Sequence, residues 1–360
     1  MNKSPSQRPL RMKGLTLIEL MIALVLGLVV VAGVGSVMLA NRQTYTTNQA
    51  LADVQESVRS AFELLAYDIR QSGGTPCGTT INFANTVKPA SAQAADNWWQ
   101  SLRPVLGYDG NETSTAVAFA PDANAVTLRV QNTDAITLGG TDTTLDVTVA
   151  DHQANANSAT LFISNPTPDI LDGDILLICD FKQTTIFQVT NYQSTNNTVV
   201  ANTGNTQSPG NCTKNLTGNF DCSIDPNAAT SSTGDFFDKN QTFISRPSSV
   251  TWYIGQNGRA EDGGRSLYQI SLQHRPTRGI RTIEIASGVT DMQLRYKTRT
   301  GADFVTAASL SSSGAWETVD AVEITLTLQS ATQGASTSTA NQGRLSRQVT
   351  TVVAMRNRVE

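Results

Sequence analysis

Residues 13–24 read Lys-Gly-Leu-Thr-Leu-Ile-Glu-Leu-Met-Ile-Ala-Leu and open the apolar run that decides the architecture of the chain. Residues 15–40 contain a single charged residue, Glu19. As a helix this run is ~39 Å long, which is enough to cross a hydrocarbon core of ~30 Å. The leader before it has no acidic residue, and its basic residues are Lys3, Arg8, Arg11 and Lys13. This charge bias predicts a cytoplasmic N-terminus and a head on the other side of the membrane.

Two simpler explanations of the apolar run are a cleaved signal peptide and a plain membrane anchor. A signal peptide has an apolar region of about 7–15 residues that ends in small residues of the A-x-A type. The present run is longer, and its end, Val37-Met38-Leu39-Ala40, lacks that pattern. A plain anchor leaves Glu19 unexplained, because a carboxylate in lipid costs several kcal/mol and needs a partner or a purpose.

The string from Lys13 to Leu24, with its basic leader, resembles the class III signal of type IV prepilins and pseudopilins. The resemblance implies that a prepilin peptidase cuts after Gly14 on the cytoplasmic face and that the new N-terminal residue, Leu15, is then N-methylated. Glu19 corresponds to the family's acidic residue, which the resemblance assigns to subunit assembly. Leu15 departs from the usual phenylalanine, and this departure bears on methylation more than on cleavage.

The helical pattern continues beyond the apolar run. Apolar residues recur at spacings of three and four, which predicts one stripe of an amphipathic helix; they are Leu51, Val54, Val58, Phe62, Leu65 and Ile69. Arg59 and Glu63 form an i,i+4 pair on the other side. Gly73-Gly74 followed by Pro76 predicts the end of the helix. We therefore expect one helix of about 55 residues, roughly 80 Å long, from residue 16 to residue 71.

Composition and charge describe the rest of the chain. Hydrophobic residues make up 39% of the sequence and charged residues 16%, with a net charge of −4. Without the four basic residues of the leader, 22 basic residues face 30 acidic ones, which gives a net charge of −8. A phosphate backbone would be repelled by this charge, so nucleic acid is an unfavourable partner. The polar, weakly charged head is typical of a secreted or envelope protein.

Short alternating or β-branched runs predict strands through the head. The clearest are Val126–Val130, Leu145–Val149, Asp174–Cys179, Thr185–Val189, Val250–Ile254, Leu267–Ile270, Ile280–Ile285, Met292–Tyr296, Val322–Leu328 and Val349–Val353. Ser287-Gly288 predicts a hairpin between two of these runs, and residues 180–184 predict another. Polar stretches at 84–97, 201–216 and 329–343 indicate exposed loops.

These elements predict an α+β fold, in which one long helix packs on a mainly antiparallel sheet with large loops. Four segments follow from this interpretation. They are a cytoplasmic leader (1–14), the transmembrane part of the helix (15–40), its amphipathic part (41–72) and a periplasmic or extracellular head (73–360).

Several head segments are similar to minor pilins of the PilW type. The segments that carry this similarity are Asp68-Ile69-Arg70 before Cys77, Asp172-Gly173-Asp174 before a strand that ends at Cys179, Thr251–Ile254, Ser266–Tyr268, Gly288–Asp291, Trp316 before the strand at 319–328, and Val352–Arg358. The resemblance implies a minor pilin of the inner membrane that takes part in starting type IV pilus assembly or in the tip complex. Its implied partners are other minor pilins, the major pilin, the peptidase and N-methyltransferase, and a large tip adhesin.

The four cysteines fit an oxidising compartment. Cys212 and Cys222 flank a polar loop that a disulfide between them would close, and Cys77 and Cys179 would then form the second pair. Three connectivities are open, and we favour this one. Free buried thiols are the alternative. A zinc site is disfavoured, because neither histidine lies at a ligand-like spacing from a cysteine.

No motif in the sequence predicts catalysis, a cofactor or a metal site. Glu261-Asp262-Gly263-Gly264 is typical of an acidic surface loop. A group of basic residues near the predicted hairpin indicates either a solvated sheet face or a binding patch; it comprises Arg275, Arg278, Arg281, Arg295, Lys297 and Arg299. Two rival functions therefore stand beside the minor pilin: a type II secretion pseudopilin, and a DNA-uptake or adhesion pilin that uses the basic hairpin.

Overall fold

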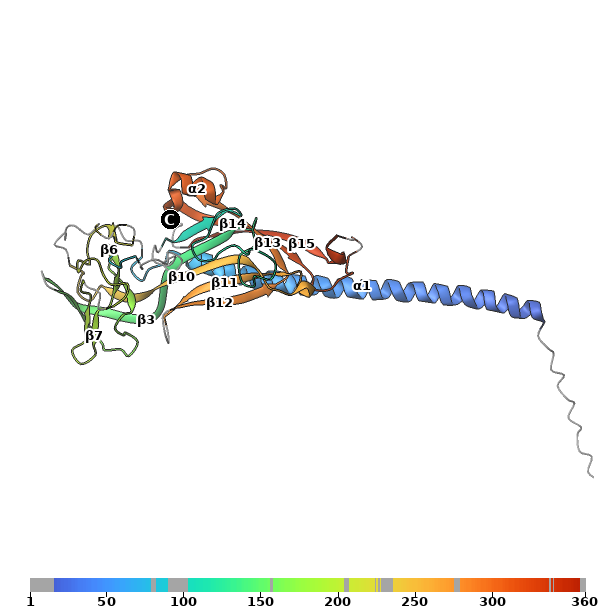
Figure 1. The fold of residues 1–360 in the computed structure, drawn as a ribbon, viewed down its shortest axis with the longest axis horizontal. Helices are drawn as coiled ribbons and strands as arrows, with labels where there is room; N and C mark the ends of the chain where they lie inside the picture. The colour runs from blue at the N-terminus through green and yellow to red at the C-terminus, as the bar shows by residue number, and fades with distance from the viewer. Residues whose placement is uncertain are drawn as a thin grey trace, which may run out of the picture.

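The computed structural model describes residues 16–78, 82–89, 103–155, 158–203, 207–223, 236–274, 279–336 and 340–356, with the single residues 225, 227 and 338. In this part of the chain one long helix, α1 (Leu17–Gln71), projects from a β-rich head (Figure 1). The head has a proximal lobe around the second half of α1 and a distal lobe beyond the end of the helix. This long apolar helix with a large, mostly antiparallel sheet domain is the predicted α+β architecture.

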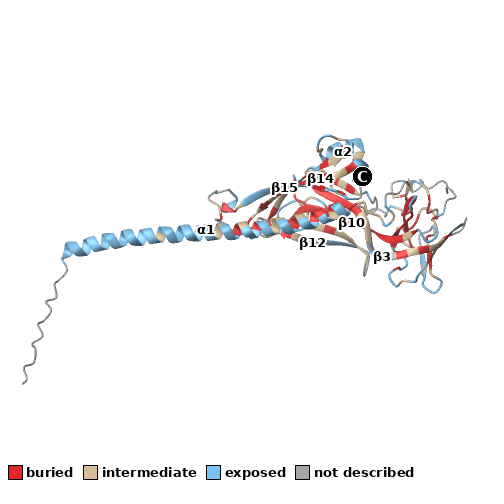
Figure 2. Cartoon of the chain, turned by 180° about the vertical axis from the view of Figure 1, so that it is seen from behind, coloured by how far each residue is buried: buried red, intermediate tan, exposed pale blue. Residues whose placement is uncertain are grey.

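Helix α1 begins and ends as its sequence predicts. Thr16 is the N-cap, and Glu19 completes a capping box with it. Ser72 leaves the helical conformation, and Gly73 follows with a φ of 73°. Figure 2 shows the two halves of the helix: the first is exposed on all sides, and the second has one buried stripe. The buried residues of this stripe are Ala50, Val54, Ala61, Leu65, Ala66 and Ile69.

The larger sheet is ordered β7-β8-β4-β3-β10-β5-β6-β1-β9 in the described residues, with β2 on β3 and with β11 and β12 continuing from β10. Its pairs are antiparallel except for those of β1 with β6 and β9. The strands are β1 (Asn82–Asn85), β2 (Val105–Tyr108), β3 (Ala135–Asn155), β4 (Ser158–Ile163), β5 (Ile175–Cys179), β6 (Gln183–Gln188), β7 (Asn191–Gln193), β8 (Thr198–Val200), β9 (Phe220–Asp221), β10 (Phe243–Gln256), β11 (Arg265–Gln273) and β12 (Gly279–Ser287). A short helix, η2 (Ala260–Asp262), lies between β10 and β11.

A second sheet contains β13 (Val289–Thr298), β14 (Val319–Gln329) and β15 (Ser346–Ala354), in that order. The short helices α2 (Ala307–Ser313) and η3 (Ala315–Thr318) join β13 to β14, and η4 (Ala340–Gly343) precedes β15. The buried side of this sheet, the second half of α1 and part of the larger sheet share the main core, in which Trp252 and Trp316 are the largest side chains.

Two long strands, β3 and β10, run through both lobes and join them. Near its start β10 pairs with β5 of the distal lobe, and near its end it pairs with β11 of the proximal lobe. A separate core fills the distal lobe between β3, β4, β5, β6 and β8. A third core lies under the loop between β2 and β3, where the buried guanidinium of Arg129 donates to backbone carbonyls of Tyr108, Asp109, Glu112 and Thr133.

Most predicted strands are present, and the hairpin across residues 180–184 is confirmed as β5–β6. The strand predicted at Val126–Val130 is wrong: these residues form turns, and Thr127 has a φ of 68°. The stretch 84–97 is not wholly an exposed loop either, because Ala84 and Asn85 end the buried strand β1.

The predicted Ser287-Gly288 hairpin is also wrong. β12 pairs with β11, whereas β13 pairs with β14, so Gly288 carries the chain from one sheet to the other. Its φ is 74°, its N–H donates to Arg265 O, and its carbonyl accepts from Gln329 N. A Cβ at this position would lie 2.5 Å from Gln329 O, so the crossing requires glycine.

Candidate functional site

The start of α1 places the carboxylate of Glu19 within its own first turn. Glu19 Oε2 accepts from the backbone N of Thr16 at 3.0 Å and from the Thr16 hydroxyl at 2.9 Å, and Glu19 N donates to Thr16 Oγ1 at 3.3 Å. An acidic residue here also interacts favourably with the positive end of the helix. In the single chain Glu19 is therefore exposed and bound to Thr16. Gly14 and Leu15 lie outside the described residues.

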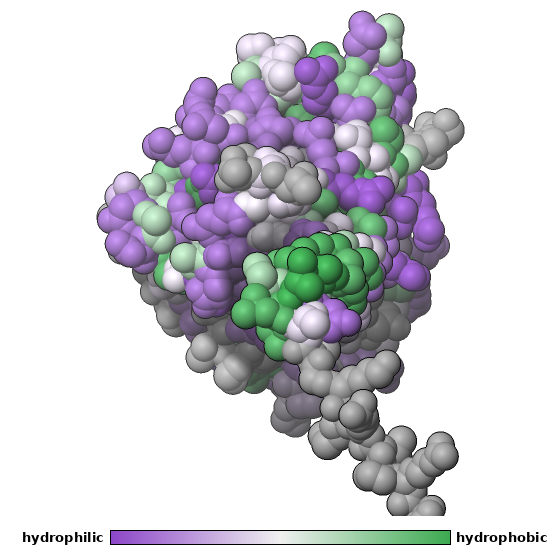
Figure 3. Space-filling view, turned by 90° about the vertical axis from the view of Figure 1, so that its right-hand side faces the viewer, coloured by the Kyte–Doolittle hydropathy of each residue, from purple (hydrophilic) through white to green (hydrophobic). Residues whose placement is uncertain are grey.

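The first half of α1 presents a mostly apolar surface, in which Glu19 is the one charged residue up to Ala40. Every residue from Leu17 to Tyr45 is exposed except the half-buried Gly35. Figure 3 looks at this end of the molecule, where green apolar side chains gather on the helix in front of a mostly purple head. Within the described residues α1 is the one helix long and apolar enough to cross a membrane. An exposed apolar surface of this size needs lipid or other helices around it.

The head first contacts the helix just beyond this apolar half. The loop between β14 and β15 reaches along α1, and two of its carbonyls accept side-chain hydrogen bonds from the helix. Gln43 Nε2 donates to Gly334 O at 2.7 Å, and Thr47 Oγ1 donates to Ala335 O at 2.8 Å. These contacts lie only a few residues beyond Ala40, so the head stands close to the end of the apolar run.

The other end of α1 is fixed by the half-buried carboxylate of Asp68. Asp68 Oδ2 accepts from Trp252 Nε1 on β10 and from Gln269 Nε2 on β11, both at 2.8 Å. Burial raises the pKa of Asp68, and the two hydrogen bonds act in the opposite direction. The carboxylate also borders a cleft of about 250 Å³ between the helix end and both β3 and β10. The sequence did not single out this contact, because a lone Asp on a helix does not reveal donors far away in the chain.

Two disulfides fix the segments beyond the helix. Cys77, six residues after α1, is bonded to Cys179 at the end of β5, and Cys212 is bonded to Cys222. This is the connectivity that the sequence favours. The first bond joins the end of α1 to the distal lobe across 102 residues of sequence, and the second closes a local loop.

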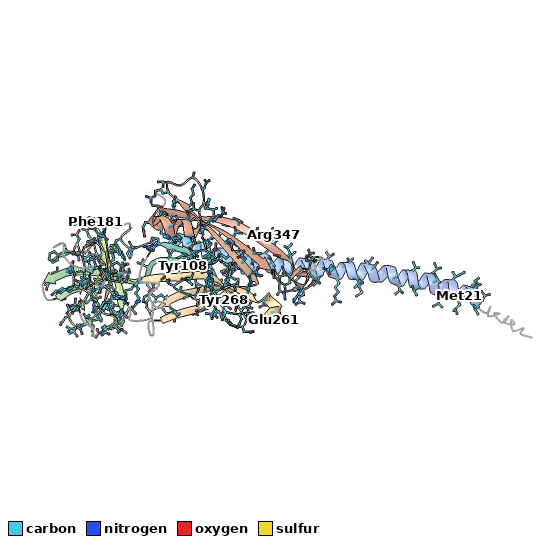
Figure 4. All side chains as sticks on the ribbon, turned by 45° about the horizontal axis from the view of Figure 1, so that its top comes forward. Met21, Tyr108, Phe181, Glu261, Tyr268 and Arg347 are labelled. Atoms are coloured by element: carbon cyan, nitrogen blue, oxygen red, sulfur yellow. A yellow bond between two sulfur atoms is a disulfide. The ribbon has the colours of Figure 1, made fainter. Side chains whose placement is uncertain are left out.

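The structure separates the basic residues that the sequence grouped. Arg281 lies on β12 in the larger sheet, whereas Arg295 and Lys297 lie on β13 in the smaller one, and Arg275 and Arg278 fall outside the described residues. Arg295 is opposite Glu323 on β14. Within the described residues these basic side chains therefore do not share one hairpin, because β12 and β13 belong to different sheets. Glu261 lies in η2, at the surface of the proximal lobe (Figure 4).

The two histidines lie in different places and do not form a site together. His152 is buried in the distal lobe against Phe236 and Phe237, and burial lowers its pKa to about 4. His274 Nε2 lies 2.7 Å from the backbone O of Pro247 on β10. No group of three or more acidic, histidine or cysteine side chains able to hold a metal occurs in the described part of the chain.

Comparison with known proteins bears on the N-terminal segment. A family model described as the prokaryotic N-terminal methylation motif matches residues 10–35, which cover the leader junction, Glu19 and much of the apolar half of α1. No curated protein matches the chain. This motif is the signal of type IV pilins and pseudopilins, so it supports a pilin-like, membrane-anchored protein with a structural role. The exposed apolar helix joined to a large β-rich head fits the same class.

Proposed function

We propose that the chain is a minor pilin of the PilW type, which helps to start type IV pilus assembly or occupies the pilus tip. The observation that carries the proposal is the methylation motif at the start of α1. The apolar half of this helix is exposed, and its other half packs on a large two-lobed head. A head with two lobes and three cores is large for a subunit that only repeats along a filament. The proposed partners are other minor pilins, the major pilin and a large tip adhesin.

In this proposal the chain is cleaved after Gly14 and methylated at Leu15, and the helix spans the inner membrane with the head in the periplasm. Residues 15–40 form the spanning segment, residues 41–72 the part of the helix that packs on the head, and residues 73–360 the head. After assembly the spanning segment leaves the lipid and packs among the helices of other subunits.

Glu19 is proposed to set the axial register of the assembling subunit. Among apolar helices its carboxylate would pair with the methylated amine of a neighbouring subunit, because either charge alone there costs several kcal/mol. In the single chain the same carboxylate is held by Thr16. Assembly therefore replaces a hydrogen bond within the chain by an ion pair between chains.

Two substitutions separate the register role from the capping role. Glu19→Ala removes both the charge and the helix cap, whereas Glu19→Gln keeps an acceptor for Thr16 and removes only the charge. We expect both variants to be cleaved, inserted and folded, and both to lose most of the co-purified pilins and surface pili. If Glu19→Gln retains normal partner recovery and piliation, the carboxylate serves only as a cap and the register role is wrong.

Deletion of the gene distinguishes the minor pilin from a type II secretion pseudopilin, whose signal is the same. A minor pilin predicts fewer surface pili and reduced twitching, with the major pilin still made and processed. Normal piliation together with failed secretion of folded exoproteins would identify a pseudopilin instead.

A further inference from the structure

The position of Glu19 in α1 fixes the depth at which the apolar half of the helix leaves the hydrocarbon. Glu19 is the one charged residue in residues 15–40, and a carboxylate lies at a membrane interface rather than in the core of the bilayer. The run from Leu20 to Ala40 is then ~30 Å long, which matches a hydrocarbon core of ~30 Å. Asn41 therefore begins the polar headgroup layer on the head side of the membrane.

The residues that follow Ala40 are typical of a membrane interface. Arg42 and Tyr45 are exposed on the helix, and arginine and tyrosine anchor membrane helices at this level. The headgroup layer on one side of a bilayer is ~5–8 Å thick, which equals about three to five residues of helix. Residues 41–45 therefore cross this layer, and Thr47 lies at its outer boundary.

The β14–β15 loop (residues 330–345) reaches into the same layer. Figure 1 shows it as the part of the head nearest the apolar half of α1. Gln43 Nε2 donates to Gly334 O at 2.7 Å, and Thr47 Oγ1 donates to Ala335 O at 2.8 Å. Side chains on a helix lean toward its N-terminus, so Gln43 holds Gly334 at the depth of its own Cα or closer to the membrane. The tip of the loop therefore lies at the level of the headgroups.

The loop has a composition that suits a headgroup layer. Residues 330–345 contain no acidic residue, and their one charged residue, Arg344, is 5% exposed. Exposed side chains in its described part include Gln333, Asn341 and Gln342, whose uncharged amides can donate to phosphate oxygens. The chain without its leader has a net charge of −8. A stretch without acidic residues therefore avoids the repulsion that anionic headgroups exert on the rest of the head.

The nearest acidic residues lie beyond the headgroup layer. On α1 the first acidic residue after Glu19 is Asp53, thirteen residues or ~20 Å beyond Ala40. Asp53 and Asp262 line the same cleft beside α1, so the short helix η2 lies at this greater distance as well. The part of the head at headgroup level is therefore the part without acidic side chains.

The loop is held rigidly before any contact with lipid. The guanidinium of Arg344 donates to three backbone carbonyls, two at the start of the loop and one in η2; they are Ser330 O, Ala331 O and Ala260 O. Across the loop, Ser336 N donates to Gly343 O at 2.8 Å. A surface that is already ordered loses little conformational entropy when it binds.

We propose that the β14–β15 loop is a membrane-contact surface, which lies among the phospholipid headgroups on the head side of the membrane before the subunit is assembled. This role rests on the proposed spanning segment, residues 15–40. Because the loop is fixed both to α1 and to the smaller sheet, its contact with the headgroups sets the height and tilt of the head above the bilayer. The head then meets other subunits in one orientation, and the contact with lipid is broken when the helix leaves the membrane.

Fluorescence quenching in vesicles of phosphatidylethanolamine and phosphatidylglycerol tests this contact. The full-length chain carries one added cysteine with a small fluorophore, and part of the phosphatidylethanolamine carries a nitroxide quencher on its headgroup. Gln333→Cys reports on the loop, Asn41→Cys on the headgroup layer, and Glu56→Cys on the helix farther out; all three positions are exposed. We expect quenching at Gln333→Cys to lie within about twofold of Asn41→Cys and to exceed Glu56→Cys at least about threefold, because ~20 Å of helix separates the two levels.

The outcomes separate this inference from the spanning segment on which it rests. If Gln333→Cys is quenched as weakly as Glu56→Cys while Asn41→Cys is strongly quenched, the loop stands away from the membrane and the contact is wrong, but the spanning segment stands. If Asn41→Cys is also weakly quenched, the apolar run does not end at the headgroups and both are wrong. Neither readout depends on partner recovery, so the pilin function is tested separately by Glu19→Gln.

Photocrosslinking of the wild-type chain tests the same contact without a substitution that could disturb the native disulfides. The vesicles contain phosphatidylethanolamine with a diazirine on its headgroup. Trypsin releases the loop in the peptide of residues 300–344, because Arg299 and Arg344 are consecutive cleavage sites. We expect lipid adducts within residues 331–336 of this peptide. Adducts on residues 41–47 of α1 with none on the loop peptide contradict the proposed contact.

Discussion

Replacing Asp68 with alanine removes the carboxylate that accepts hydrogen bonds from both Trp252 and Gln269, at the junction between α1 and the larger sheet. The indole N–H of Trp252 is fully buried, so this variant leaves it without its protein partner. An unsatisfied buried donor costs about 1–3 kcal/mol, and the lost bond to the half-buried Gln269 adds about 0.5–1 kcal/mol.

Two features of the site reduce the expected loss of unfolding free energy. The adjoining cleft of about 250 Å³ is large enough for water to reach the abandoned donor. Burial also raises the pKa of Asp68, so removing the carboxylate relieves part of its desolvation. We therefore expect Asp68→Ala to lower the free energy of unfolding by about 2 kcal/mol, and Asp68→Asn, which keeps one carbonyl acceptor, by about 1 kcal/mol.

Chemical unfolding of the full-length chain in detergent, followed by tryptophan fluorescence, measures this difference. Glu63→Ala is the control, because Glu63 lies on the exposed side of the same helix and its ion pair with Arg59 is open to solvent; its midpoint should match wild type. An Asp68→Ala midpoint indistinguishable from that of Glu63→Ala would refute the argument that this carboxylate holds the helix to the head.

Two further predictions concern stability. Removing Cys77–Cys179 by paired serine substitutions should lower the free energy of unfolding by about 5 kcal/mol, and removing Cys212–Cys222 should lower it by about 3 kcal/mol, because these bonds close loops of 102 and 10 residues. An equal or reversed ranking in chemical unfolding would contradict the loop-closure argument. Burial raises the pKa of Asp134 from 3.8 to about 6, so its contribution to stability is greatest below pH ~4 and is lost as pH rises to about 6. The melting temperature of Asp134→Asn minus that of wild type should therefore increase as pH rises from 4 to 6. A difference that does not change with pH would contradict the buried-carboxylate explanation.

Local patterns in the sequence predicted the elements whose causes are local. The apolar run, the capping residues and the three-and-four spacing fix α1 along its length, and Gly73-Gly74 fixes its end. Alternation predicted β13 and β14, because one face of each strand is buried and the other is not. These patterns reflect burial on one side, which is visible in a single segment.

Features that depend on pairing across the chain were not predictable in this way. Gly288 has the turn chemistry of a hairpin, but it crosses between sheets because the partners of β12 and β13 are β11 and β14. Val126–Val130 has β-branched composition, but Arg129 is held by distant carbonyls within a loop. The contacts of Asp68 could not be predicted from its own segment, since its donors are supplied by β10 and β11.

Intact-mass analysis of the protein recovered from membranes, with sequencing of its N-terminal peptide, tests the central claim most directly. The account predicts a chain that lacks residues 1–14 and begins at Leu15 with a methylated amine, because the methylation motif spans this junction. A protein that retains the basic leader, or that is cleaved near Ala40, would contradict the assignment to the pilin-like class.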